Sequence, residues 1–108
     1  MKINWKKYLG CSFFIHIFLI SSLFANQIPS QNDIAEVNRL VEKKNFSEAI
    51  DIYSDWVALG FKSKWIFYNL GLLHENMGNI GYAMFYLKKA EKIAPDDALI
   101  NKRNIILQ

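Results

Sequence analysis

The chain has 108 residues, a formal charge of +3 at pH 7 and a single cysteine. One cysteine cannot form a disulfide within the chain, so a disulfide-stabilised scaffold is excluded. The isoelectric point near 9.0 is basic, but the basic surplus is confined to the N-terminal segment, which argues against a nucleic-acid-binding protein.

Residues 1–25 have the pattern of a secretory signal peptide. Lys2, Lys6 and Lys7 form a basic start, and an apolar run from Leu9 to Phe24 follows them. We predict cleavage after Ala25, where small and polar residues begin. Leu23 is large for the third position before the cut, so an uncleaved membrane anchor is the alternative. Its apolar run of about 16 residues is marginal for a hydrocarbon core of about 30 Å.

Cys11 lies early in the apolar run. A lipoprotein cysteine follows such a run, so we do not expect lipidation at Cys11. Residues 26–108 form the predicted domain, with 10 Lys and Arg against 10 Asp and Glu. This balance predicts no nucleic-acid partner, and the lysine pairs at 43–44 and 88–89, each with an acidic neighbour, are interpreted as solvated helix faces.

Residues 30–63 are predicted to form a first helical hairpin, with helices at about 30–43 and 46–59. Ala49, Ile50 and Tyr53 have the spacing of three and four residues that marks one face of a helix. Gly60 follows the second helix at a position where a left-handed cap is expected.

Residues 64–97 are predicted to form a second, more regular hairpin. Ser63 is the expected N-cap of its first helix. The turn Met77-Gly78-Asn79 follows that helix, and Pro95 ends the second helix because proline cannot continue it.

Small residues are expected at the helix–helix contact of this second hairpin. A glycine inside a helix costs about 1 kcal/mol relative to alanine, so Gly71 indicates a close approach of two helices. Ala83 is the predicted partner of Gly71, and Ala90 lies about two turns further on the same face.

A last helix is predicted at 98–107, with Asp96 and Asp97 offering N-cap oxygens. The predicted fold is therefore all-α, with two hairpins and a C-terminal capping helix. Because a domain of about 80 residues buries a limited core, we expect self-association or docking on a partner. The apolar residues expected to mediate this are Trp56, Phe61 and the cluster 105–107.

The two hairpins match when Ala83 is aligned with Ala49. Leu87 then falls on Tyr53, and the turn at 77–79 falls on 43–45. This period of about 34 residues, with small residues at 71, 83 and 90 and a proline at 95, resembles the tetratricopeptide repeat family. The alternative is an unrelated helical hairpin whose alanines coincide by chance.

The first hairpin departs from the pattern at three positions. Val37, Trp56 and Phe61 replace residues that the repeat prefers to be small or, at the last position, proline. We therefore expect the first hairpin to be more splayed, or Trp56 to point outward.

The resemblance implies a superhelix whose first helices line a groove that binds a protein segment. The groove would be lined by Ile34, Asn38, Val41, Trp65, Tyr68, Asn69, Leu72, Glu75, Lys102 and Arg103. Trp65 and Tyr68 would act as aromatic anchors, and Asn69 would contact the backbone of the partner. Repeats that grip a peptide carboxylate use two lysines at positions occupied here by Ile34 and Leu99, so such a clamp is not expected.

A narrower resemblance concerns the order of these features. A signal peptide, a weak repeat and the segments Phe67–Gly71 and Gly78–Ala83 are together similar to the small exported repeat proteins of bacterial aerotolerance (Bat) operons. This resemblance implies a periplasmic location, or attachment to the outer side of the inner membrane, and membrane-associated protein partners.

Three functions follow in order of preference. The first is an exported protein-interaction module, and the second is a structural accessory subunit that docks through its apolar ends. An enzyme is the third, because no catalytic or metal-binding pattern is visible. His74 is the only histidine after the signal segment and is expected in the core or the groove, so no metal, cofactor or small-molecule substrate is predicted.

Overall fold

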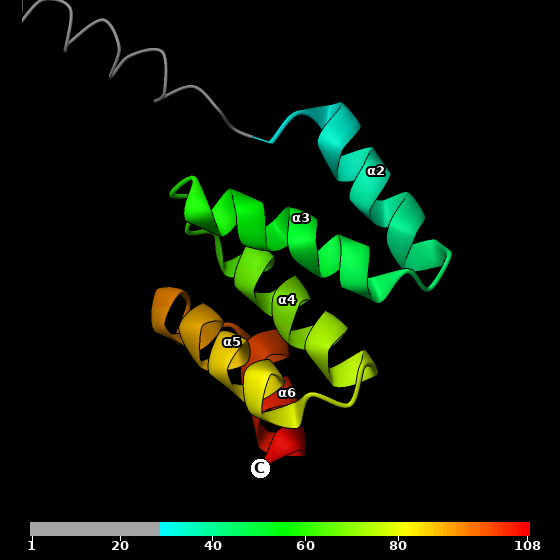
Figure 1. The fold of residues 1–108 in the computed structure, drawn as a ribbon. Helices are drawn as coiled ribbons and strands as arrows, with labels where there is room; N and C mark the ends of the chain where they lie inside the picture. The colour runs from blue at the N-terminus through cyan, green and yellow to red at the C-terminus, as the bar shows by residue number, and fades with distance from the viewer. Residues whose placement is uncertain (1–28) are drawn as a thin grey trace, which may run out of the picture. The chain divides into compact units, whose positions relative to one another are not determined.

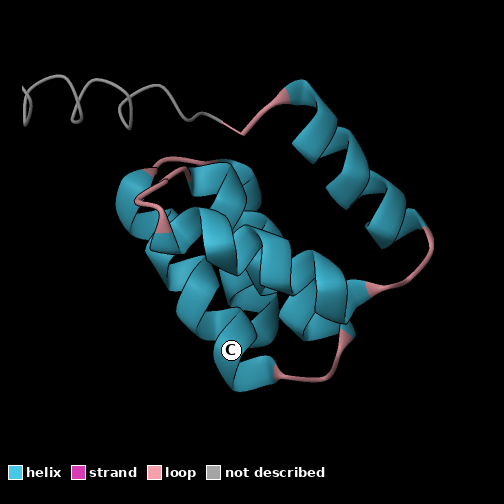
Figure 2. Cartoon of the chain, turned by 45° about the horizontal axis from the view of Figure 1, so that its top comes forward, coloured by secondary structure: helices cyan, strands magenta, loops and turns pink. Residues whose placement is uncertain are grey.

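The computed structural model describes residues 29–108 and is all-helical over this range, which confirms the predicted fold class. Figure 2 shows helices joined by short loops. The predicted signal segment, 1–25, lies outside the described residues. The helices are α2 (Gln31–Glu42), α3 (Phe46–Ala58), α4 (Lys64–Asn76), α5 (Ile80–Ile93) and α6 (Ala98–Leu107). None of these five helices is both long enough and apolar enough to cross a bilayer.

Consecutive helices pack against one another (Figure 1). The pairs α2–α3 and α4–α5 are helical hairpins. The α3–α4 contact joins the two hairpins, and α6 packs against α5. This arrangement is consistent with tetratricopeptide-like packing. The α4–α5 contact is the most extensive of the four, and the α2–α3 contact is the least extensive, which agrees with the expected splay of the first hairpin.

The turns of the two hairpins have the same backbone conformation at equivalent positions of the period. Lys44 and Gly78 both have positive φ angles, of 60° and 78°. Asn45 and Asn79 follow them with φ of −86° and ψ of 67° and 68°. The structural period therefore matches the sequence period, even though a lysine replaces the glycine that a left-handed position favours.

The helix starts show the same period. The Ser63 hydroxyl accepts a hydrogen bond from the Trp65 backbone N–H at 3.2 Å. At the equivalent position, Asp97 Oδ1 accepts from the backbone N–H groups of Leu99 and Ile100 at 3.0 and 3.2 Å. The predicted caps are confirmed at Ser63 and, of the two aspartates, at Asp97. Gly60, with φ of 99°, has the expected left-handed conformation after α3.

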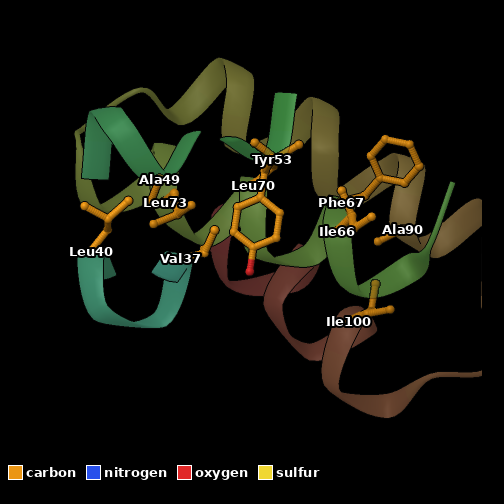
Figure 3. Close-up of a cluster of buried hydrophobic side chains, with 10 residues drawn as sticks. All are labelled: Val37, Leu40, Ala49, Tyr53, Ile66, Phe67, Leu70, Leu73, Ala90 and Ile100. Atoms are coloured by element: carbon orange, nitrogen blue, oxygen red, sulfur yellow. The ribbon is translucent and has the colours of Figure 1, made fainter. Parts of the chain in front are cut away.

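One hydrophobic core extends through all five helices (Figure 3). Leu70 and Ile100 are fully buried, and Val37 is almost so. Burying a side chain of this size contributes about 1.5–3 kcal/mol. The predicted packing residues Ala49, Ala83 and Ala90 have no exposed surface. The remaining buried hydrophobic residues are Leu40, Tyr53, Ile66, Phe67, Leu73 and Leu87.

Trp56 packs inward. The expectation that it points outward is therefore wrong. Its ring meets that of Tyr53 edge-on, with centroids 5.1 Å apart, and it packs against the core together with Phe61. Pro95 lies in the exposed loop between α5 and α6, where it ends the helix as expected.

Gly71 allows α4 and α5 to approach closely. A Cβ atom at Gly71 would lie 2.7 Å from Leu87 Cγ and 3.3 Å from the Ala83 carbonyl oxygen. Ala83 was the expected partner, and the structure adds Leu87 as the side chain that fills the space. Leu87 is fully buried and has no room to retreat.

We expect the substitution Gly71→Ala to destabilise the protein. Overpacking costs about 1–3 kcal/mol, which exceeds the gain of about 1 kcal/mol in helix propensity. Gly81→Ala is the matched control, because a Cβ there would meet nothing within 4 Å. The free energy of unfolding, measured by chemical denaturation, should fall for Gly71→Ala and stay the same or rise for Gly81→Ala. Equal effects of the two changes would contradict the close approach.

Candidate protein-binding face

The outward side of α4 carries the largest share of the predicted groove residues. Trp65, Tyr68, Asn69, Leu72 and Glu75 follow one another at spacings of one or three residues, so they share one face of the helix. Trp65 is 49% exposed, and the other four are half-buried. The structure therefore brings these five predicted residues together on one surface.

Two aromatic rings dominate this surface. The rings of Trp65 and Tyr68 meet edge-on, with centroids 6.1 Å apart. Lys64 Nζ lies 4.8 Å from the Trp65 ring centroid, a distance typical of a cation–π contact. Trp65 is thus exposed and also held in place by its neighbours.

Lys64 connects this aromatic pair to the start of α6. Its Nζ donates a hydrogen bond to Asp97 Oδ2 at 2.9 Å. This bond and the backbone N–H of Ile100 hold the pKa of Asp97 below its usual value. The roles of Lys64 and Asp97 beside the aromatic pair were not predicted. One signal was present in the sequence, since Asp97 lies one period after the cap residue Ser63.

Asn69 makes a contact inside the protein. Its Nδ2 donates a hydrogen bond to the hydroxyl oxygen of Tyr53 on α3 at 2.9 Å. Burial raises the pKa of Tyr53, and the hydrogen bond from Asn69 opposes that rise. Asn69 therefore aligns α4 with α3, and its contact with a partner stays a prediction.

Glu75 and Arg103 bind each other. Arg103 Nε donates to Glu75 Oε2 at 2.8 Å, and Arg103 Nη2 donates to Glu75 Oε1 at 2.7 Å. This bidentate pair joins α4 to α6 and is partly shielded, with side-chain exposures of 21% and 33%. Both residues are on the predicted face, but their charges neutralise each other there.

The other groove residues lie on α2 and α6. Asn38, on α2, and Lys102, on α6, are exposed. The exposed hydrophobic side chains on these helices are Ile34 and Val41 on α2, and Leu99, Ile105 and Ile106 on α6. Among the predicted groove residues, the exposed apolar ones are thus Trp65, Ile34 and Val41, and Lys102 is an exposed cation.

His74 lies against α5. Its ring stacks on those of Tyr82 and Tyr86, with centroid distances of 5.1 and 5.4 Å. Its Nδ1 atom is buried and has no hydrogen-bond partner. Burial lowers the pKa of the imidazole below its usual 6.5, because the charged form loses hydration. Within residues 29–108, no three His, Cys, Asp or Glu side chains gather to hold a metal ion.

We expect stability to fall as the pH is lowered through the titration of His74. The unfolded chain binds a proton near pH 6.5, whereas the folded protein resists protonation until lower pH, so acidification favours unfolding between these two pKa values. His74→Phe keeps an aromatic ring between the tyrosines and removes the titration. The free energy of unfolding, measured at intervals from about pH 8 to pH 5, should drop more for the unmodified chain than for His74→Phe. Parallel curves for the two proteins would rule out this role of His74.

Comparison with protein-family models and with curated proteins finds no match to this chain. The resemblance to tetratricopeptide repeats therefore stays a prediction from the sequence, and the helical hairpin packing is consistent with it.

Proposed function

We propose that the chain is a protein-interaction module whose α4 face binds a segment of a partner protein. The observation that carries this proposal is the Trp65–Tyr68 pair, which is held edge-on at 6.1 Å with Trp65 half exposed. Large aromatic side chains that are both exposed and restrained are the typical anchors of protein interfaces, because they bury much area at a small entropic cost.

The surroundings of the aromatic pair favour an apolar or amphipathic partner segment. Leu72 adds a half-buried apolar side chain on the same side of α4, and the exposed Leu99 of α6 lies one period after Trp65. Glu75 and Arg103 neutralise each other, and Lys64 is paired with Asp97, which leaves little net charge close to the anchors. A helix with apolar residues at spacings of three and four, or an extended segment with alternating apolar residues, matches such a surface.

The proposal includes export of the protein and a membrane-associated partner. The signal-peptide pattern of residues 1–25 supports export to the periplasm or to the outer side of the inner membrane. A binding module needs no cofactor, metal or small-molecule substrate, so we propose a role in assembly and not in catalysis.

A second candidate function is that of an accessory subunit docked through its C-terminal helix. Ile105 and Ile106 are 72% and 59% exposed, and they form an apolar surface at the end of the described chain. Trp56 and Phe61, the other residues expected in such docking, pack against the core and offer less surface.

The double change Trp65→Ala and Tyr68→Ala tests the proposal. Both side chains are partly exposed, so the fold should persist, and the loss of two aromatic anchors should weaken partner binding by about 2 kcal/mol or more, or about 30-fold. The measurement is quantitative capture of proteins from envelope extract by the unmodified and the changed chain, followed by titration of the captured partner in purified form.

The double change Ile105→Ser and Ile106→Ser is the matched control. The proposal expects this control to retain the partner that the aromatic variant loses. Loss only in the isoleucine variant would favour the accessory-subunit function, and unchanged binding in both variants would reject both surfaces.

A further inference from the structure

The second helices of the two hairpins carry opposite charges. α3 contains three acidic residues and no Lys or Arg, whereas α5 contains three lysines and one glutamate. The buried positions of the two helices correspond, since Ala49 and Ala83, and likewise Tyr53 and Leu87, are core residues one period apart. Core packing therefore does not account for the difference, which lies on the outer surfaces.

The acidic residues of α3 form one exposed stripe. Glu48, Asp51 and Asp55 follow at spacings of three and four residues, and the stripe continues to Leu59, which is 62% exposed. Glu48 accepts a hydrogen bond from Asn45 Nδ2 at 2.6 Å. No ion pair within residues 29–108 involves Asp51 or Asp55. We call these four residues the acidic stripe.

The exposed side of α5 carries aromatic residues followed by lysines. Tyr82 and Phe85 are 63% and 52% exposed. Lys89 Nζ lies 4.9 Å from the Phe85 ring centroid, and Lys92 is exposed and has no ion pair among the described residues. We call Tyr82, Phe85, Lys89 and Lys92 the aromatic–basic stripe.

We propose that the acidic stripe of one copy binds the aromatic–basic stripe of a second copy, with α3 and α5 antiparallel. In this orientation Leu59 meets Tyr82 and Phe85, while the carboxylates of α3 meet the lysines of α5. At 1.5 Å per residue the stripes are about 17 and 15 Å long, so they match from end to end. The helix dipoles also oppose each other favourably.

The second copy is the occupant that these surfaces select. Each stripe offers the charge that the other needs, and each has an apolar segment at the end where the other has one. The two stripes differ, so a single contact uses α3 of one copy and α5 of the other. The first copy keeps its aromatic–basic stripe free and the second keeps its acidic stripe free, so assemblies can grow by addition of further copies. Because the charged groups stay near solvent, the contact is sensitive to salt.

Charge reversal tests this contact in the full-length chain. One variant carries Asp51→Lys and Asp55→Lys, and the other carries Lys89→Glu and Lys92→Glu. Copies with two different affinity tags are mixed in a non-ionic detergent, which solubilises the apolar N-terminal segment without screening charge. Co-isolation of the second tag through the first measures association, and circular dichroism verifies that each variant keeps its helical content.

We expect each variant alone to lose co-isolation by about tenfold or more relative to the unmodified chain, because like charges then face each other. Mixing the two variants should restore co-isolation, since the unchanged acidic α3 of the lysine variant then meets the unchanged basic α5 of the aspartate variant, and the two reversed helices also match in charge. Raising the salt from about 0.05 to about 0.5 M should weaken the unmodified contact. A variant with Lys62→Glu and Lys102→Glu has the same change in charge as the variant with Lys89→Glu and Lys92→Glu, but at positions outside both stripes. It should associate normally.

The outcomes separate this contact from the partner-binding face. Trp65→Ala with Tyr68→Ala should leave co-isolation unchanged, so failure of the proposed function would not affect this test. Equal co-isolation in all variants, or no recovery in the mixture, would overturn the contact. Loss in the lysine variant alone would indicate another acidic partner for α5, such as an anionic lipid surface, and would also overturn it.

Discussion

The close approach of α4 and α5 at Gly71 governs how the other helices are placed. Without a side chain at Gly71, Leu87 packs directly against the backbone of α4. α4 is also the helix that contacts α3 on one side and that is bonded to α6 through Arg103. The position of α4 therefore sets the placement of its neighbours and the direction in which Trp65 points.

Polar contacts between helices fix how the packed helices are oriented relative to one another. The Asn69–Tyr53 hydrogen bond joins α4 to α3, and the Glu75–Arg103 pair joins α4 to α6. Partly exposed pairs of this kind contribute little net free energy, because desolvation offsets much of the attraction. Their geometric requirement is stricter, since a bidentate pair forms in only one alignment of the two helices. Residues expected to meet a partner thus serve first to align the helices.

The two hairpins share a backbone pattern but differ in surface. Their turns have the same conformation, and the cap positions Ser63 and Asp97 are one period apart. Their outer helices nevertheless carry opposite charges, and α4 carries the aromatic pair on its outward side. Repetition thus builds the scaffold, while differences at exposed positions supply the binding specificity that we propose. The aromatic face and the charged stripes belong to different helices, so one copy has room for both contacts.

Helices, turns and caps follow from the amino-acid sequence alone. Helix ends depend on local chemistry, as at Ser63, Gly60 and Pro95, and apolar spacing identifies the buried side of each helix. The glycine at Gly71 also indicated a close approach, since its cost within a helix needs a reason. These features involve residues within a few turns of one another, so spacing along the chain was enough to predict them.

Which distant side chains meet is a property of the packed molecule. Packing pairs Glu75 with Arg103, places the Tyr53 hydroxyl beside Asn69, and turns Trp56 inward against the core. It also stacks His74 on two tyrosines of α5. The spacing of residues along the chain does not predict these contacts. They depend on the rotation of each helix about its axis and on its distance from the next helix. Both quantities are set by the packing of the whole core.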